Sequence, residues 1–385
     1  MGANTLTGLI PVIYDAATTV FREMTGLIMA VSKDATAETA ALNQTVRSPV
    51  IPAITPQAIT YTPYPTDEGE QTLTYTDMTL DKAYQAPIKW NGEEQVSLGS
   101  MNDAVVKYQF QEGFRAIVNM VEADLAALYY KASRAYGTAG TTPFGSTHAD
   151  ITAQLKKILD DNGVPISERS LIIDTAAGAN LRSLTGLNTV YAAGTEATLR
   201  QGLLLPLNGF DVRESAQIKS HTKGAGTGYG IAAAGEAVGQ TTLSLDGGTV
   251  NTTGIANGDI VTFAGGATDA NKYVVTTGLQ ATSGDIVIGK PGLKIVKVDA
   301  DALTIGNSYT ANMAFHRNAI HLAARVPKMP FGGDGADDVT EVTDPVTGLT
   351  FQIAMYRLHR MVKIEIGLVW GCNVMNPQSL ALLLG

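Results

Sequence analysis

The sequence predicts an α+β protein assembled from several modules, and three patterns lead to this expectation. A long amphipathic pattern over residues 102–134 indicates one dominant helix. A glycine-rich stretch with short apolar runs over 216–312 indicates a separate β unit, and alternating apolar residues within 313–385 indicate further strands. With 385 residues, of which 45% are hydrophobic, the chain can form roughly two to three domains with packed cores.

The first 90 residues divide into two segments. Residues 1–44 carry apolar side chains at partly helical spacing, which predicts an N-terminal arm that docks on a neighbour or on its own body. Residues 45–90 begin with five prolines between positions 49 and 65 and continue with a Thr-rich run, a pattern typical of a long β-hairpin. An acidic tip, which contains Asp67, Glu68 and Glu70, separates its two arms. A long two-stranded hairpin is marginal alone, so we expect it to lie on another subunit.

Residues 102–134 give the clearest helical pattern of the chain. Asn102 or Asp103 can cap its start, and glycines at 137 and 140 end it. At a rise of ~1.5 Å per residue such a helix is about 50 Å long, so it must bridge modules. Its apolar positions recur at spacings of three and four on one stripe: Val106, Phe110, Phe114, Ile117, Val121, Leu125 and Leu128.

Residues 150–215 alternate between helical and strand patterns. A helix is expected over 151–159, closed by the Asp-Asn-Gly sequence at 161–163, and a short buried strand over 170–174. Residues 203–212 suggest a strand pair or hairpin around Pro206 and Gly209. This combination indicates α+β or α/β material.

The composition changes at residue 216. Residues 216–312 hold 17 of the 40 glycines, and the alternating glycines over 224–230 suggest a flexible linker into an inserted domain. Short runs separated by turn residues indicate a small β-barrel or sandwich. The expected strands lie at 260–263, 273–275, 286–288, 294–297 and 303–305 in this segment, and at 319–326, 349–356, 361–369 and 380–384 beyond it.

The charge balance argues against a protein that binds DNA through its phosphates, and the motifs argue against an enzyme. A formal charge of −9 leaves no basic face that could grip phosphates. Residues 284–290 match the spacing of a phosphate-binding loop, but Pro291 stands where that loop requires Ser or Thr. The acidic turn at 332–344 lacks EF-hand spacing, so we interpret it as a solvated loop. We find no metal-spaced histidines and no catalytic triad pattern, and we expect no catalytic residue, cofactor or metal.

The single cysteine and the N-terminus bear on the compartment. Cys372 lies among apolar residues, which predicts a buried and inert thiol. We find neither a signal peptide nor an apolar run near the ~18 residues that span a membrane. We therefore expect a protein without membrane association that is made and kept in the cytoplasm, or in a particle assembled there.

Several stretches resemble the major capsid proteins of tailed bacteriophages, whose fold is named after phage Hong Kong 97. The stretches most similar to the short-tailed-phage branch with an inserted β domain are 4–11 (NTLTGLIP), 89–94 (KWNGEE), 122–129 (EADLAALY), 258–265 (GDIVTFAG) and 315–320 (FHRNAI). The resemblance covers essentially the whole chain. It implies an N-terminal arm over 1–44, an extended loop over 45–90, a spine helix and peripheral domain over 91–149, an axial domain over 150–215, an inserted β-barrel over 216–312, and a return to the axial and peripheral domains over 313–385.

The resemblance also implies a function. Such proteins form hexamers and pentamers of an icosahedral shell around double-stranded DNA, assembled in the host cytoplasm as a procapsid that expands on packaging. The implied partners are further copies of the chain, a scaffolding protein, a portal protein at one vertex and the enclosed DNA, while a decoration protein is left open. Some relatives crosslink subunits through a Lys and an Asn. The hairpin tip at 66–71 has no Lys, so we expect non-covalent assembly.

The expected interface residues are charged. The acidic hairpin tip requires basic partners on an adjacent subunit, and basic residues on or near the long helix are candidates. A loop of the inserted domain is a further candidate contact. These residues are Asp67, Glu68, Glu70, Arg115, Lys131, Arg134 and Asp246. The alternatives are an encapsulin-type or other non-viral shell protein, a surface-layer protein, for which the secretion signal is missing, and a glycan-acting enzyme, which would need paired carboxylates in a cleft.

Overall fold

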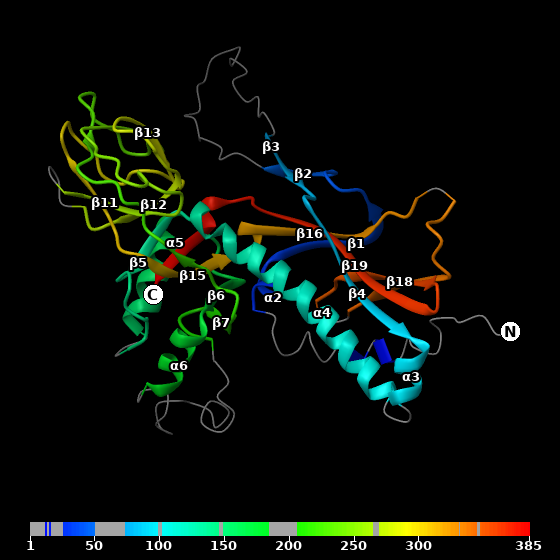
Figure 1. Ribbon diagram of the computed structural model, residues 1–385. Helices are drawn as coiled ribbons and strands as arrows, with labels where there is room; N and C mark the ends of the chain where they lie inside the picture. The colour runs from blue at the N-terminus through cyan, green and yellow to red at the C-terminus, as the bar shows by residue number, and fades with distance from the viewer. Residues whose placement is uncertain are drawn as a thin grey trace, which may run out of the picture.

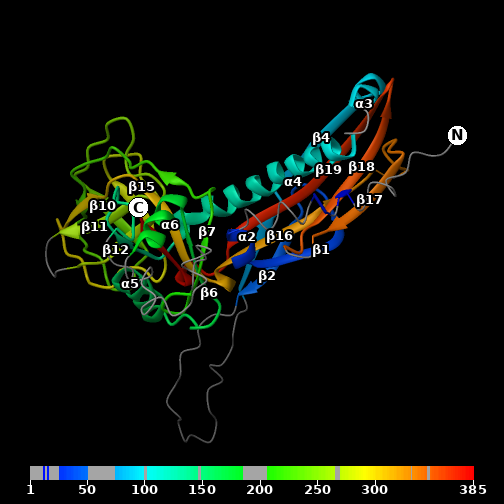
Figure 2. The ribbon, with the colours of Figure 1, turned by 90° about the horizontal axis from the view of Figure 1, so that it is seen from below.

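The protein is described from a computed structural model. It describes residues 12–13, 15–16, 26–50, 74–98, 102–145, 149–184, 206–264, 269–330, 332–344 and 347–385. Within these ranges one long helix runs along a β-rich body, and a separate small β-barrel lies at the opposite end of the molecule from helix α3 (Figures 1 and 2). The acidic hairpin tip and residues 203–205 lie outside the described residues.

A six-stranded sheet forms the elongated part of the body. Its order is β1-β16-β19-β18-β17, and β4 pairs with the other edge of β19. The long strand β19 is central because its first half pairs with β18, its second half with β16, and most of its length with β4. The strands are β1 (Ser32–Ala40), β4 (Lys82–Asn91), β16 (Ile320–Pro327), β17 (Asp338–Thr343), β18 (Thr350–Leu358) and β19 (Met361–Val374).

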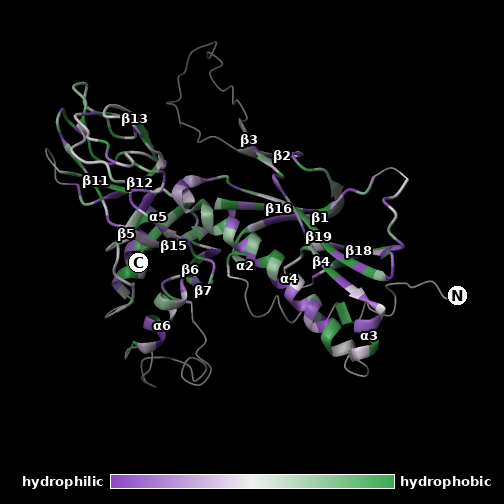
Figure 3. Ribbon diagram, viewed as in Figure 1, coloured by the Kyte–Doolittle hydropathy of each residue, from purple (hydrophilic) through white to green (hydrophobic). Residues whose placement is uncertain are grey.

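The long helix α4 (Asn102–Ala126) crosses this sheet and contacts β4 and β19. The predicted stripe is confirmed, since all its members from Phe110 to Leu128 are buried. Its residues alternate between hydrophobic and hydrophilic along the ribbon (Figure 3). The predicted end at 134 is wrong: the helix tightens into the 3₁₀ segment η3 (Ala127–Lys131), and Ala132 is extended. At ~1.5 Å per residue the α-helical part is about 38 Å long.

A second sheet builds the compact part of the body. Strands β5 (Arg134–Gly137), β20 (Leu380–Leu384), β15 (Tyr309–His316), β6 (Arg169–Ile173) and β7 (Phe210–Glu214) follow one another in it, and β8 (Ser220–His221) pairs with β15. Helices α5 (Ala149–Asp161) and α6 (Thr175–Ser183) share a core with its strands. The expected hairpin around Gly209 is confirmed in its described part, since Leu207 and Phe210 form an antiparallel bridge across a tight turn. After this turn β7 pairs in parallel with β6, a pairing that requires a crossover connection, which includes α6.

The glycine-rich segment forms a closed barrel with its own core. Strands β9 (Gly230–Ile231), β10 (Thr242–Asp246), β11 (Ile260–Ala264), β12 (Lys272–Thr277), β13 (Gly284–Ile288) and β14 (Ala302–Ile305) form a ring, because β11 pairs with both β14 and β12. The expected strand at 294–297 is wrong, since in it only Lys297 makes a bridge, to Glu236. Residues 284–290 do not form a phosphate-binding loop, as expected, because β13 occupies most of them.

The base of the extended hairpin is present, but its second arm is shorter than predicted. β2 (Thr45–Val50) pairs with β3 (Thr74–Thr79), while the following residues join the large sheet as β4. Met78 and Leu80 pack with Val369 in a small cluster that anchors this base to the body. The acidic turn is also more ordered than a solvated loop, since half of it is β17 and its carboxylates bind the side chains of Tyr356, Arg357 and Thr347.

The shorter elements hold the N-terminal region and the far end of the sheet. Ile13 and Ala16 are fully buried in the main core, which agrees with an arm that docks on its own body. Helix α2 (Leu27–Ala30) follows, and β4 continues into α3 (Gly92–Leu98). The start of α3 is fixed by a capping box, in which Asn91 and Glu94 each accept a hydrogen bond from the backbone N–H of the other.

Candidate assembly interfaces

Among the predicted interface residues that the structure describes, some are accessible at the surface and others are bonded inside the subunit. Arg115 lies partly exposed on α4 and pairs with Glu112 one turn away. Lys131 donates to Asn373 Oδ1 at 2.7 Å, and burial lowers the pKa of its amine. Arg134 is 4% exposed and is bonded within the chain, so it is a structural residue of the subunit rather than a surface charge. Asp246 is exposed at the end of β10.

An apolar groove runs between α4 and β4. It encloses about 640 Å³ and is lined by side chains of both elements, among them Ile88, Ile117 and Met120. Two tyrosines stand at this groove with much of their surface in water, since Tyr84 is 46% and Tyr108 is 64% exposed. Lys89 and Glu112 add charge to it. Tyrosine is enriched where proteins bind one another, so this groove is a candidate contact surface of the body.

A buried polar cluster joins the barrel to the end of the long helix. The fully buried Asp259 carboxylate accepts from His221 Nε2 at 2.8 Å and from the backbone N–H groups of Gly224 and Ala256. On the other side of the imidazole ring, the Tyr129 hydroxyl lies 2.9 Å from Nδ1. Because Tyr129 belongs to η3 and Asp259 to the barrel, this cluster fixes one module against the other.

The same cluster corrects the interpretation of 224–230 as a flexible linker. A Cβ atom on Gly224 would lie 2.2 Å from the carbonyl oxygen of Gly254, so no side chain fits there. Gly226 N–H donates to that carbonyl at 3.1 Å. These glycines allow two backbone segments to touch, which is a packing role. The segment is therefore tied down at the barrel entrance.

A second polar cluster lies where β12 meets β5. Arg134 donates to Asn271 Oδ1, to the carbonyl of Ile158 and to Asn162. Asn271 in turn donates to Asp269, whose carboxylate lies 3.0 Å from the ammonium of Lys297 inside the barrel. Although burial opposes it, hydrogen bonds from Asn271 and Lys297 lower the pKa of Asp269. This network connects the Asp269–Lys297 ion pair inside the barrel, through Asn271, to Arg134 in the body.

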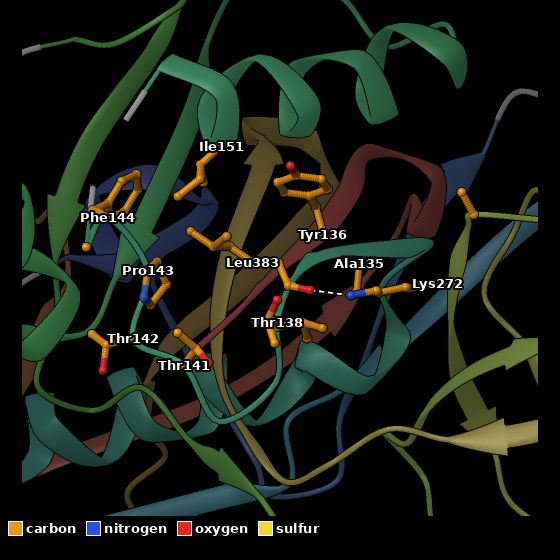
Figure 4. A pocket seen from close by; sticks show the side chains of 14 residues that line it. Ala135, Tyr136, Thr138, Thr141, Thr142, Pro143, Phe144, Ile151, Lys272 and Leu383 are labelled. Atoms are coloured by element: carbon orange, nitrogen blue, oxygen red, sulfur yellow. Dashed lines mark hydrogen bonds between the residues drawn. The ribbon is translucent and has the colours of Figure 1, made fainter. Parts of the chain in front are cut away.

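A cavity of about 490 Å³ lies beside this second junction (Figure 4). Tyr136, Phe144 and Leu383 line it with apolar surface, and Thr138, Thr141 and Thr142 add hydroxyl groups. The amine of Lys272 donates to the carbonyl of Gly137, and burial lowers the pKa of that amine. The described residues that line this cavity include no Asp, Glu, His or Cys.

The N-terminal region is held to α4 by a buried carboxylate. Glu122 is fully buried and accepts from the backbone N–H groups of Leu27 and Ile28 and from the Ser215 hydroxyl. Burial raises the pKa of Glu122 even though these donors oppose the rise. Nearer the start of α4, Lys107 pairs with Asp15. The segment before β1 is thus attached to α4 at two points.

The structure also bears on the cysteine, on metal binding and on membrane spans. Cys372 is half-buried, and burial raises the pKa of its thiol to about 12. Within the described ranges no group of three or more His, Cys, Asp or Glu side chains could hold a metal ion. The described helices include none that is both long and apolar enough to span a membrane.

Comparison with known proteins identifies the fold. No family model and no curated protein matches the sequence. Among solved structures, the capsid of cyanophage P-SCSP1u matches with a TM-score of 0.52 at 10% identity, over 94% of this chain and 88% of that one. The mature capsid of bacteriophage PhiM1 matches with a TM-score of 0.46 at 10% identity, over 94% and 87%. Mycobacterium phage Che8 gives 0.45 at 14% identity, over 89% and 85%. On the first of these matches, the chain has the fold of a phage capsid protein.

Proposed function

We propose that the protein is a structural capsid subunit that self-assembles into hexamers and pentamers of an icosahedral shell around double-stranded DNA. The observation that carries this proposal is the shared fold with the cyanophage capsid chain over 94% of the sequence. The formal charge of −9 suits a container that surrounds DNA without gripping its phosphates. A scaffolded procapsid, a portal vertex and a virion location belong to the same proposal.

The hairpin and the groove supply a physical route to rings of subunits. The base of the hairpin leaves the body beside β1 and β16 (Figure 1). The groove is lined by residues of α4 and β4. Two different surfaces that bind each other form a heterologous contact, and such contacts close into rings when the rotation fits. We propose that the acidic residues Asp67, Glu68 and Glu70 contact a neighbour near Arg115. Each contact is weak alone and becomes strong when a ring of subunits repeats it.

Electron microscopy of the purified protein tests the proposed function. The subunit is expressed alone and together with a candidate scaffolding protein, and particles are imaged by negative stain. Closed shells, with hexamers and pentamers resolved by cryo-electron microscopy, are the expected result. A monodisperse monomer under both conditions, at concentrations where capsid proteins assemble, contradicts the proposal. Shells that hold a co-purified enzyme instead of DNA favour the encapsulin alternative.

The hairpin contact has its own test. The double variant Glu68→Lys with Glu70→Lys is expected to fold normally and to lose shell assembly, because it places positive charge against Arg115. The matched control is Asp299→Lys, which reverses the charge of an exposed acidic residue on the barrel that is not a candidate contact. Normal shells from the double variant contradict the hairpin assignment and leave the shell function intact.

A further inference from the structure

The cavity beside the second junction is built from segments that lie far apart in the sequence. One wall comes from β5 and the turn at 138–145 that follows it, a second from the end of β20, and a third from residues 270–272 at the entry to β12 (Figure 4). The first two walls belong to the body and the third belongs to the barrel. The volume of about 490 Å³ falls within the range of about 300–1,000 Å³ that is usual for sites of small molecules.

The apolar wall of the cavity is preformed. Phe144 has a φ of +63°, a left-handed value that a bulky residue keeps only where the surrounding structure fixes it. Its side chain is fully buried and shares with Leu383 the core that α5 and α6 form with the compact sheet, and Ile151 packs against that core. A ligand with an apolar body therefore meets a wall that requires no rearrangement.

The polar side of the cavity carries one positive charge. Lys272 is the one charged residue among the described residues of the lining, and its amine donates to the carbonyl of Gly137. Burial lowers the pKa of this amine, and no carboxylate of the described chain pairs with it to raise that pKa again. Asp150 accepts from the Tyr136 hydroxyl at 2.8 Å but does not line the cavity. The remaining polar groups of the lining are the hydroxyls of Thr138, Thr141 and Thr142.

We propose that this cavity binds a small free carboxylate that carries an apolar body, such as a medium-chain or aromatic acid. The carboxylate pairs with the ammonium of Lys272, because a partly desolvated cation without a counter-charge is stabilised by an anion. The apolar body lies against Tyr136 and Leu383. Because Lys272 belongs to the barrel and these two residues to the body, the bound acid bridges the two modules. This inference goes beyond the shell function and does not depend on it.

Calorimetric titration of the purified full-length subunit with octanoate and with octanol tests the proposal. The two probes share an apolar chain, and only octanoate carries a charge, so the wild type is expected to bind octanoate more tightly. Lys272→Met removes the ammonium and keeps most of the apolar stem. It should weaken octanoate binding by about tenfold, which is typical of a lost charge-assisted bond, and leave octanol binding unchanged. Lys157→Met, which changes an exposed lysine of α5 that does not line the cavity, is the matched control and should bind both probes like the wild type.

A second variant tests the place of binding. Ala270 is exposed at the edge of the cavity, so Ala270→Trp can fill the space without disturbing a core, and it should abolish binding of both probes. Thermal unfolding shows whether each variant is folded, and octanoate should raise the unfolding temperature of the wild type, since a ligand stabilises the state that binds it. A wild-type subunit that does not bind octanoate at millimolar concentration overturns the inference. Equal octanoate affinity in Lys272→Met, or binding that persists in Ala270→Trp, also overturns it. All these measurements use the soluble subunit, so their outcome is separate from whether shells form.

Discussion

Replacing Asp259 with alanine should weaken the attachment of the barrel to the body. The change removes one carboxylate that accepts from the backbone N–H groups of Gly224 and Ala256 and from His221 Nε2, at distances from 2.7 to 3.1 Å. A buried donor that loses its partner costs about 1–3 kcal/mol. With two backbone donors and one imidazole affected, and some relaxation, we expect a loss of about 3–5 kcal/mol in the free energy of unfolding.

Denaturant unfolding and hydrogen exchange measure this loss together. The midpoint of the barrel's transition should fall, and the amides of Gly224 and Ala256 should exchange faster than those in the core of the large sheet. Asp246→Ala is the matched control, since this exposed aspartate on the same barrel should change stability by less than about 0.5 kcal/mol. Tyr129→Phe removes only the hydroxyl beside His221 Nδ1 and should cost about 1 kcal/mol.

The reasoning fails if Asp259→Ala costs less than about 1 kcal/mol, the lower end of the range for one unpaired donor. It also fails if the two amides keep their protection. Either result would mean that the barrel is held by its strand pairing between β12 and β5 and by the second polar cluster, with no need for the first.

Two further changes follow from the buried positions. Gly371→Ala would place a Cβ 2.2 Å from the carbonyl oxygen of Thr79 at the base of the hairpin, so thermal unfolding should begin at a clearly lower temperature. The control is Gly113→Ala, whose Cβ would closely approach only the flexible end of the Ile366 side chain, so its unfolding temperature should be nearly unchanged. Burial raises the pKa of Glu122 above its ordinary value of 4.5, so its contribution to stability is present below that pH and is lost as the pH rises through the native pKa. Glu122→Gln cannot titrate and should flatten this dependence in denaturant unfolding at a series of pH values; an unchanged slope contradicts the assignment.

Local patterns in the sequence were sufficient for much of the fold. The stripe from Phe110 to Leu128 is buried because a helix that covers a sheet must bury one face. The residues of that face recur at spacings of three and four, a pattern that is visible in the sequence. The barrel strands β11 to β14 were predicted because each is short, apolar and bounded by turn residues, whereas β9 and β10 were not predicted. The end of α4 was missed because residues 127–131 keep a helical composition while their backbone tightens to a 3₁₀ form.

The junctions were missed because their partners are far apart along the chain. His221 lies 38 positions from Asp259 and 92 from Tyr129, so no motif spacing joins them. The one local signal was the Gly-Asp pair at 258–259, which sequence patterns present as an ordinary turn. The role of Arg134 was misjudged for the same reason, since a basic residue near the end of a helix looks exposed until Asn271 and Asn162 are brought beside it.

The way in which the barrel is attached bears on how such a subunit could assemble. Most of the barrel's apolar core forms a cluster of its own, and Ile260 of β11 and Val274 of β12 pack instead into the main core of the body. Directional contacts add to this apolar contact: the Asp259 carboxylate, the Arg134 guanidinium, and a close backbone approach in which a Cβ on Gly289 would lie 2.0 Å from the carbonyl of Ala132. Such bonds tolerate little displacement, because an unpaired buried charge is costly. The barrel should therefore move as one body with the end of α4. The position of any contact that the barrel makes through Asp246 would then depend on the orientation of that helix.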